Sequence, residues 1–430
     1  MIGLIESTGG RAPLRPSAVV REGQPTAAVV GGGPGGLMAA EVLAGAGVAV
    51  TLFERMPSVG RKLLLAGRGG LNLTHSEPLA QLLGRYGPAE ERLAEAVRSF
   101  GPDDLRAWCA GLGQPTFVGS SGRVFPEALR ATPLLRAWLA RLAGLGVQLR
   151  VRHTWQGWDG GGALLFLGPS GTERLHPDVT LLALGGASWP RVGSDGAWVP
   201  VLETAGVAVT PLRPANCGFV VGWSPVFADR FAGGSLKNVR LSFGAVAVRG
   251  DTTITTQGIE GGALHVLSAS LRDQVAASGS AVLGVDLHPD LTVDDLRLRL
   301  ARGRAKDSLS TVLKRAGGLQ PIAVGLLREV TGNRLPRHPG ALARLVKEVR
   351  VPVVAVQPLA RAISTAGGVA LDELDATFML RRRPGTFVVG EMLDWEAPTG
   401  GYLLQATFST AVRAATAAAA LAMARAGPPG

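Results

Sequence analysis

The sequence predicts an α/β fold in which a Rossmann-like domain is interrupted by a β-rich domain and a small helical domain. Residues 27–54 read as a strand, a glycine turn, a helix and a second strand, which together form one βαβ unit. The apolar run 179–184 suits a buried parallel strand of the same sheet. A strand at 386–389 and an alanine-rich helix at 403–426 resume this pattern near the end of the chain. An insertion therefore separates two halves of one domain.

The residues between these halves predict the other two domains. Several short β-like runs, separated by Gly, Pro and Asp, fill residues 199–262, whereas residues 263–348 read as mainly helical. Outside the insertion, helices are expected at 89–112 and 127–145 and a strand at 147–152. The predicted boundaries are a flexible extension at 1–26, a nucleotide-binding domain at 27–190 and 351–430, a β-rich domain at 191–262 and about 335–350, and a helical subdomain at 263–334.

Length and composition describe a globular protein of more than one domain. The chain has 430 residues, beyond the ~250–300 at which single cores usually stop growing. Hydrophobic residues make up 46%, and no window of ~18 uninterrupted apolar residues occurs, so no membrane span is expected. Residues 1–26 lack the basic-then-apolar order of a secretion signal, which predicts a cytoplasmic protein. Because Cys109 and Cys217 form no CxxC motif, we expect two buried thiols rather than a disulfide or a redox dithiol.

The formal charge of +11 raises nucleic acid and anionic membranes as partners, since Lys and Arg neutralise phosphates. The arginines are spread along the chain, as at Arg213, Arg240 and Arg302, and the densest run, 381–383, is followed at once by Pro384. Solvated surface charge is therefore the favoured interpretation, and neither a membrane nor a nucleic-acid partner is expected. No HExxH, paired CxxC, GxSxG or Walker A pattern is present, so the sequence predicts no metal site and no acyl- or phosphoryl-transfer site.

A glycine motif after the first strand predicts a dinucleotide site. In Gly31-x-Gly33-x-x-Gly36, which includes Pro34, the glycines allow a tight turn, close approach of a pyrophosphate and close helix packing. The helix N-terminus adds amide donors and partial positive charge. Glu54 ends the next strand, ~20 residues on, where a carboxylate accepts hydrogen bonds from ribose hydroxyls. The motif does not by itself separate FAD from NAD.

A glycine-rich loop favours FAD. Residues 57–62 and 67–75 form this loop where a pure NAD domain would continue into a helix. We expect its backbone amides to bind phosphate or the flavin ring, with Arg61 or Lys62 as counter-charge and Asn72 beside the cofactor. A plain surface turn is the alternative.

The end of the chain completes the predicted FAD site. The returning strand delivers Gly390 and Glu391, and Gly400-Gly401-Tyr402 opens the last helix. In FAD folds of this class, the returning Gly-acid pair meets the ribityl and pyrophosphate region. The last helix directs its N-terminal amides at the flavin, where negative charge develops on reduction. A helix start chosen only for packing is the alternative.

These motifs together resemble a known family. The chain is similar to the aminoacetone oxidase family of FAD-binding enzymes, also described as bile-acid dehydro-reductase-like flavoproteins. The matching blocks lie at about 27–75, 179–196, 256–261 and 362–412, and they read VGGGPGGLMAAEVLAGAG, GRKLLLAGRGGLNLTHSE, LLALGGASWPRVGSDG, TAGGV and GEMLDWEAPTGGYLLQATFSTA. The family often has Gly-Gly-Arg-Cys-Asn where this chain has Gly69-Gly70-Leu71-Asn72 after Arg68, so the chain reads as a distinct subfamily.

The resemblance implies a role for each matching residue. It places Gly31, Gly33 and Gly36 at the pyrophosphate, Glu54 at the adenosine ribose, Arg61 and Lys62 beside the cofactor, the backbone of Trp155 at adenine, Gly185 and Gly186 in the FAD cleft, and Glu391, Gly401, Tyr402 and Leu403 at the ribityl chain and flavin.

The chemistry expected from such a site is that of the flavin. The sequence predicts an FAD-dependent oxidoreductase that transfers hydride between flavin N5 and a small organic substrate, with NADH or NADPH as a candidate electron donor. An amine oxidase using O2 is one alternative, and a nucleic-acid-associated flavoprotein, such as a tRNA-modifying enzyme, is a less favoured one. His75 and Tyr402 are the candidate proton donors, and no other catalytic residue is assigned.

Overall fold

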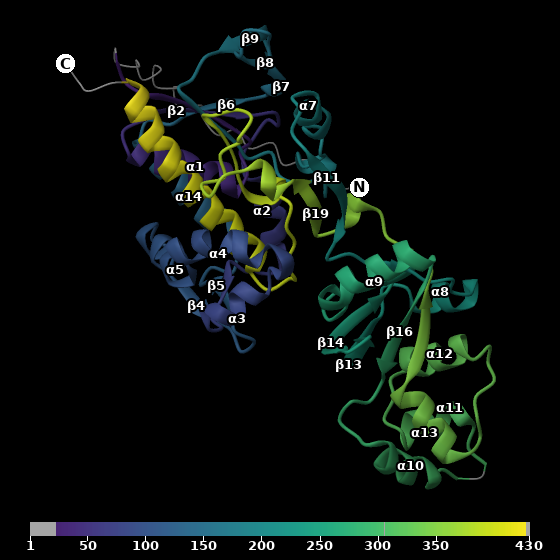
Figure 1. Cartoon of the computed structure of the whole chain (residues 1–430). Helices are drawn as coiled ribbons and strands as arrows, with labels where there is room; N and C mark the ends of the chain where they lie inside the picture. The colour runs from purple at the N-terminus through teal and green to yellow at the C-terminus, as the bar shows by residue number, and fades with distance from the viewer. Residues whose placement is uncertain (1–22, 305, 427–430) are drawn as a thin grey trace, which may run out of the picture.

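The computed structural model describes residues 23–304 and 306–426, which form two bodies joined by a pair of strands (Figure 1). The first body is built from both ends of the described chain, and the second from residues between them. Each body has its own hydrophobic core. Most of the predicted N-terminal extension, as far as residue 22, lies outside the described residues.

A five-stranded parallel sheet forms the centre of the first body. Its strand β10 (Val179–Leu182) pairs with β1 (Thr26–Val30) on one side and β20 (Thr386–Val388) on the other. All four residues of β10 are buried, as expected for a parallel strand covered on both faces. The full order is β20-β10-β1-β2-β6, with β2 at Ala49–Glu54 and β6 at Gln148–Val151. The predicted fold class, a Rossmann-like domain split by an insertion, is confirmed.

Two layers cover this sheet. On one face α1 (Pro34–Gly45) packs against the long C-terminal helix α14 (Tyr402–Ala426), which runs beside it in Figure 1. Small side chains let the two helices approach closely, since α14 buries a row of alanines: Ala411, Ala414, Ala415, Ala418 and Ala422. The other face is covered by an antiparallel sheet of β7 (Thr154–Trp158), β8 (Leu164–Gly168) and β9 (Gly171–Leu175). In this layer Phe166 stacks on Phe53, with the ring centroids 3.9 Å apart. Within the described residues, no helix has both the length and the apolar character that crossing a bilayer requires.

A helical lobe extends the first body, and it corrects two expected boundaries. The helix expected at 89–112 is two helices, α4 (Glu90–Ser99) and α5 (Pro102–Gly111). The chain breaks there because Pro102 has no N–H for a continuing helix, and the Gly101 N–H donates to Asp104 instead, at 2.8 Å. The helix expected at 127–145 begins later, as α6 (Ala131–Gly144). The lobe also contains α2 (Arg61–Ala66), α3 (Leu79–Gly84) and a sheet of β3 (Thr74–His75), β5 (Arg123–Pro126) and β4 (Thr116–Val118).

The second body contains a seven-stranded antiparallel sheet. Its longest strands, β13 (Ser235–Phe243) and β14 (Val246–Ile254), form a hairpin where the sequence predicts β-like runs. The β-like runs predicted within 199–262 overlap strands of the structure. The residues before the first of these runs form the helix α7 (Val199–Thr204), whose Leu202 is buried in the core of the first body. The other strands of the sheet are β12 (Phe219–Val220), β15 (Gly258–Glu260), β16 (Ala281–Asp286), β17 (Val349–Val353) and β18 (Ala355–Val356).

Helices surround this sheet and extend beyond it. One of them, α9 (Leu264–Ser278), contacts β13, β14 and β16. Strand β16 interrupts the segment expected to be mainly helical, because its residues alternate between buried and less buried with the period of a strand. Beyond the sheet, at the end of the second body far from the parallel sheet, lie α10 (Val293–Ala301), α11 (Leu309–Arg315), α12 (Pro321–Val330) and α13 (Pro339–Lys347), with α8 (Pro225–Phe231) against α12 (Figure 1).

The junction between the bodies is held by strand pairing and by one buried cation. Strand β11 (Val209–Ala215) leaves the first body and pairs with β19 (Ser364–Val369), which returns to it. At the junction, the guanidinium of Arg272 is 2.8 Å from the carboxylate of Glu396 and 3.0 Å from that of Asp273, and its side chain is only 4% exposed. Burial alone would lower the pKa of Arg272, but the hydrogen bonds that it donates to both carboxylates raise the pKa above its ordinary value. The cation therefore stays charged where the bodies meet.

Both cysteines are free and buried, as predicted. Burial raises the pKa of Cys109 to about 12 and that of Cys217 to about 11. We therefore expect no thiol to react with Ellman's reagent at pH 8 in the native protein, and two to react in guanidinium chloride, because only an exposed thiolate attacks the reagent. A thiol that reacts quickly while the circular dichroism spectrum stays native would contradict this packing.

Candidate functional site

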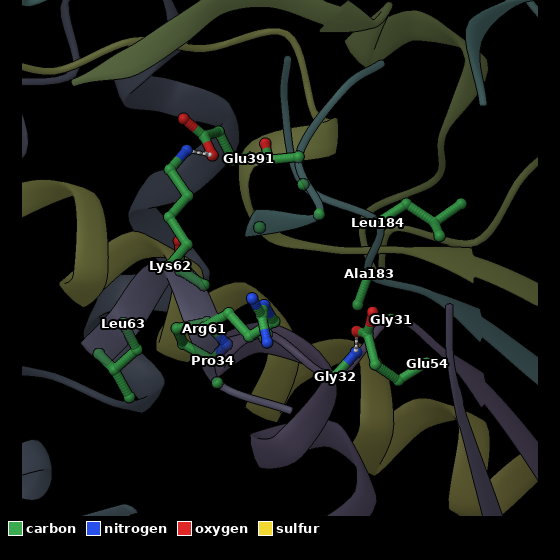
Figure 2. Close-up of a pocket in the computed structure, with 18 of the residues that line it drawn as sticks. Gly31, Gly32, Pro34, Glu54, Arg61, Lys62, Leu63, Ala183, Leu184 and Glu391 are labelled. Carbon is green, nitrogen blue, oxygen red and sulfur yellow. Dashed lines mark hydrogen bonds and ion pairs between the residues drawn. The ribbon is translucent and has the colours of Figure 1, made fainter. Parts of the chain in front are cut away.

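A deep cleft opens at the carboxyl ends of the parallel strands, where α/β sheets of this kind bind ligands (Figure 2). Its space, open mouth included, is about 1240 Å³. The residues that follow β1, β2, β10 and β20 all line it, so segments from both ends of the chain form its walls.

The glycine turn after β1 is built so that its backbone lies open to the cleft. Gly31 has φ +109°, and a Cβ there would lie 2.3 Å from the Ala183 carbonyl oxygen. A Cβ on Gly36 would lie 1.9 Å from the Gly31 carbonyl oxygen, so this glycine serves the packing of α1 against the turn. A Cβ on Gly33 would meet no protein atom within 4 Å, and its φ of −81° suits any residue. Gly33 is therefore not required by the fold, and the space beside it suits a pyrophosphate at the N-terminus of α1.

Glu54 lies at the end of β2, where the sequence predicts the ribose-binding carboxylate. Its Oε2 accepts a hydrogen bond from the Gly32 N–H at 2.8 Å, and its Oε1 accepts one from the Met56 N–H at 2.7 Å. Figure 2 shows the carboxylate against the glycine turn. A carboxylate oxygen has more than one lone pair, so Glu54 can accept a ribose hydroxyl while it holds the turn in place.

Several buried polar atoms of the cleft lack a partner, which tests whether a ligand fits there. Among the described residues, six buried side-chain polar atoms have no hydrogen bond, and three of them belong to cleft residues: Arg61 Nε, Trp155 Nε1 and Ser194 Oγ. Buried donors are rarely left without a partner in a native protein. All three can donate a hydrogen bond, so they suit a ligand with acceptor oxygens, such as the phosphates and ribityl chain of FAD. The residues present therefore fit the predicted cofactor.

An ion pair joins the two ends of the chain at the rim of the cleft. The Lys62 ammonium, on α2, lies 2.6 Å from Glu391 Oε2 (Figure 2). It also donates to Ser188 Oγ at 2.7 Å. Glu391, on the short helix η6 (Gly390–Met392), also accepts from the Thr365 N–H at 3.0 Å and from the Gly186 N–H at 3.4 Å. These bonds use two of the three donors of Lys62 and leave the third for a ligand.

The structure brings most of the predicted cofactor residues into this cleft. Those that line it are Gly31, Gly33, Pro34, Glu54, Arg61, Lys62, Trp155, Gly185, Gly390, Glu391 and Leu403. Those that lie outside its walls are Gly36, Asn72, Gly186, Gly401 and Tyr402. The backbone of Gly186 and Gly401 is closely packed, because a Cβ there would lie 2.2 Å from Thr365 Oγ1 and 2.5 Å from the backbone of Thr74.

The two candidate proton donors lie together, away from the walls of the cleft. The rings of His75 and Tyr402 stack with centroids 5.4 Å apart, and the guanidinium of Arg85 lies 5.7 Å from the Tyr402 ring centre. His75 Nδ1 accepts from the Glu77 N–H at 3.1 Å, so its Nε2 carries the proton that is donated to the Ser121 carbonyl at 3.0 Å. Burial and a hydrogen bond to Glu77 raise the pKa of Tyr402 above its ordinary value. Both side chains have partners in the protein, and their catalytic role stays a prediction.

Sequence reasoning missed several cleft residues. Ser194 lies in the LLALGGASWPRVGSDG block, so a signal for it was available, and its orphaned hydroxyl makes it a candidate cofactor contact. Trp395 and Ile363 add apolar walls, and no motif in the sequence distinguishes them from core residues. Arg55 lines the cleft and forms an ion pair with Asp195 at 2.9 Å.

Arg61 gives a direct test of the site. We expect Arg61→Ala to weaken FAD binding about ten-fold, because a donor to a charged acceptor is worth about 1.5 kcal/mol or more. Its buried Nε has no partner in the protein, so the melting temperature of the apo-protein should change little. Quenching of FAD fluorescence on titration measures the affinity, with the exposed Arg136→Ala on α6 as control. Equal affinities for the two variants would remove Arg61 from the site.

A comparison with protein families identifies the family of this chain. The family model described as the HI0933-like protein Rossmann domain matches residues 25–417. The chain belongs to the HI0933-like family. This confirms the family that the motifs resemble, and the match includes the insertion as well as both halves of the parallel sheet.

Characterised relatives match almost the whole HI0933-like chain. A 3-dehydro-bile acid delta(4,6)-reductase from Clostridium scindens is 25% identical over 410 residues, which cover 91% of this chain and 98% of the relative. A ribosomal RNA dihydrouridine synthase from Escherichia coli is 24% identical, with 90% of this chain and 96% of the relative covered. Among solved structures, the 3-ketosteroid delta1-dehydrogenase from Sterolibacterium denitrificans matches with a TM-score of 0.52 at 14% identity, over 92% of this chain and 100% of that chain. The family and its relatives confirm the predicted class, an FAD-dependent oxidoreductase, and the solved structure agrees with the fold.

Proposed function

We propose that this HI0933-like protein is a reductase that saturates a carbon–carbon double bond conjugated to a carbonyl group, with NADH or NADPH as the electron donor. The observation that carries the proposal is the cleft, whose free space at Gly33 and orphaned donors at Arg61 and Ser194 fit FAD. The names of two relatives supply the reaction class. A delta(4,6)-reductase of a 3-dehydro bile acid saturates such double bonds, and dihydrouridine is uridine with hydrogen added across one.

Different residues of the cleft would bind different parts of the cofactor. The glycine turn and the N-terminus of α1 would hold the pyrophosphate, and Glu54 the adenosine ribose. When bound, FAD would supply the site that accepts and donates hydride. The Lys62 ammonium, held by Glu391 and Ser188, would direct its third N–H at an acceptor atom of the ligand. Apolar side chains, among them Leu403 and Trp395, also line the cleft.

Anaerobic reduction tests the proposal and separates it from the oxidase alternative. We expect NADH or NADPH to bleach the flavin absorbance of the holo-protein rapidly without O2, and cyclohex-2-enone, a simple conjugated enone, to restore it. The Gly33→Val variant, which we expect to lack flavin, controls for absorbance of the nucleotide. A holo-protein that neither nucleotide reduces, but that consumes O2 with a primary amine, would replace the reductase by an amine oxidase.

A second candidate keeps the same reaction and changes the substrate. The uracil ring of a uridine carries a carbon–carbon double bond conjugated to a carbonyl group, and the relative from Escherichia coli is a dihydrouridine synthase of ribosomal RNA. The formal charge of +11 favours a polyanionic substrate of this kind. We therefore propose a uridine within RNA as the second candidate substrate, and mass spectrometry of RNA after incubation with the enzyme and NADPH tests it.

A further inference from the structure

The positive charge of the chain is concentrated in the helices that end the second body. Residues 293–350, which contain α10 to α13, have 13 Lys and Arg but 5 Asp and Glu, a net charge of +8 out of +11 for the whole chain. Taken one by one, the arginines suggest evenly spread surface charge. About one seventh of the chain instead carries most of the excess of basic over acidic residues. The positive charge is therefore concentrated in one region of the fold.

Most of the few acidic residues of this segment are already engaged. Asp295 accepts hydrogen bonds from Thr292 at the N-terminus of α10. Glu329 accepts from the backbone N–H and the hydroxyl of Ser224, at the start of α8. Asp294 pairs with Arg297 on its own helix. Acidic side chains therefore serve caps and local pairs here, and they leave most of the basic ones uncompensated.

The uncompensated cations are exposed. Arg297, Lys347 and Arg350 have acidic partners, and Arg328 is partly buried with Ser310 and Asn333. The other nine are exposed and, within residues 23–304 and 306–426, form no salt bridge: Arg299, Arg302, Arg304, Lys306, Lys314, Arg315, Arg334, Arg337 and Arg344. Of these, Arg299 has an acidic neighbour on its own helix, because hydrogen bonds from Thr292 and the charge of Arg299 lower the pKa of Asp295. Five of these nine lie in loops or at helix caps rather than inside helices, so attraction to helix C-termini does not account for all of them.

The four helices and the loops between them carry all nine cations. Helix α10 packs against α13 and α11 against α12, over buried residues of the second core. Figure 1 shows the group at the end of the second body, remote from the parallel sheet. We call these nine side chains the basic helical face.

We propose that the basic helical face binds the phosphate backbone of a structured RNA. Exposed Arg and Lys without acidic partners are the side chains that neutralise phosphates, and release of counterions drives such binding. A membrane surface is less well matched, because a helix that inserts into lipid needs an apolar face. Here the apolar faces of the helices point into the core, and the large apolar side chains that are exposed in this segment are Val293 and Leu298.

This inference rests on the second candidate of the proposed function and names where its substrate is held. The cleft is in the first body, whereas the helices that carry the basic helical face lie at the far end of the second body (Figure 1). A free nucleoside cannot contact both, whereas an RNA that spans them can. The face would therefore select an RNA over its isolated nucleosides.

Charge reversal tests the basic helical face. The variant Arg302→Glu with Arg315→Glu changes two exposed cations of the face, and the control Arg98→Glu with Arg136→Glu changes two exposed cations of the first body by the same total charge. Fluorescence anisotropy with a labelled RNA hairpin that has uridines in its loop gives Kd from about 50 to about 200 mM salt. We expect the first variant to bind the RNA about ten-fold more weakly. The slope of log Kd against log salt concentration should also fall by the amount expected for the loss of about two phosphate contacts. The control should bind nearly as the wild type does.

Each other outcome overturns the proposal. Equal losses in both variants would mean non-specific attraction to the net charge, and no binding by the wild type at about 50 mM salt would remove RNA as a partner. Binding to phosphatidylserine vesicles, but not to the hairpin, would assign the face to a membrane. Flavin absorbance and its bleaching by NADPH are measured on the same samples, so failure of the redox function is seen separately from failure of RNA binding.

Discussion

Gly33→Val protein should fold normally and bind FAD far more weakly than the wild type does. A side chain at Gly33 meets no protein atom within 4 Å of its Cβ, and the backbone there suits any residue, so the apo-protein gains no strain. The valine would instead fill the space in which the second glycine of the motif lets a pyrophosphate approach the backbone. We expect FAD affinity to fall on the order of a hundred-fold, about 2.7 kcal/mol, measured by FAD titration of the apo-protein.

Two other glycines of α1 and its turn provide the controls. Gly45, at the end of α1, also has open space where a Cβ would lie, but it is outside the cleft, so Gly45→Val should bind FAD as the wild type does. A Cβ at Gly36 would lie 1.9 Å from a backbone oxygen, so Gly36→Val should lower the melting temperature of the apo-protein itself. Normal FAD affinity in Gly33→Val would show that the cofactor does not approach this turn.

Arg272→Ala should be the most destabilising single change at the junction of the two bodies. The side chain is 4% exposed and bonds both Glu396 and Asp273, and its removal leaves the partly buried carboxylate of Glu396 without its bidentate partner. Breaking a buried ion pair costs about 3 kcal/mol or more. Because Glu396 is itself 31% exposed, we expect a loss near the lower end, about 3 kcal/mol, seen as a fall of several degrees in Tm.

Arg213→Ala is the matched control, because Arg213 pairs with the same Asp273 carboxylate at 3.1 Å. Both of these side chains are about half exposed, at 46% and 53%, so solvent screens the pair and its loss should cost less than about 1 kcal/mol. Similar melting temperatures for Arg272→Ala and Arg213→Ala would contradict the role of the buried cation at the junction.

The parallel sheet and the glycine turn were accessible from the sequence because their signals are local. The turn needs glycine at Gly31 and Gly36 for steric reasons, and a carboxylate at Glu54 follows at the distance that one helix and one strand require. The strand β10 was also accessible, since a short run that is apolar at every position suits a strand covered on both faces.

The features of the site that the sequence did not predict depend on the rotation of side chains around a helix and on long-range packing. Tyr402 and Leu403 are neighbours at the start of α14, yet about 100° of helical rotation separates them, so Leu403 lines the cleft while Tyr402 packs against His75. The motif predicts where the helix begins and not which side chain points at the cofactor. Orphaned atoms such as Ser194 Oγ can be recognised only when every other hydrogen bond around them is known.

The clustering of positive charge was also missed by the sequence analysis. Inspection of the arginines one by one, as at Arg213 and Arg302, suggests an even distribution. The uneven distribution of charge is seen only when the numbers of acidic and basic residues are compared in each segment. It also requires the partner of each acidic side chain, such as Thr292 for Asp295 and Ser224 for Glu329. Burial and pairing, which need coordinates, decide how much of a formal charge is available to a partner.

The cofactor released from the purified protein tests whether the cleft between the glycine turn and Glu391 is an FAD site. The protein, saturated with flavin if necessary, is denatured, and the released compound is identified by chromatography against FAD, FMN and NAD standards. We expect FAD at about one molecule per chain in the wild type and almost none in Gly33→Val. A colourless protein that fails to take up FAD, or equal FAD content in the two proteins, would contradict this assignment of the cleft.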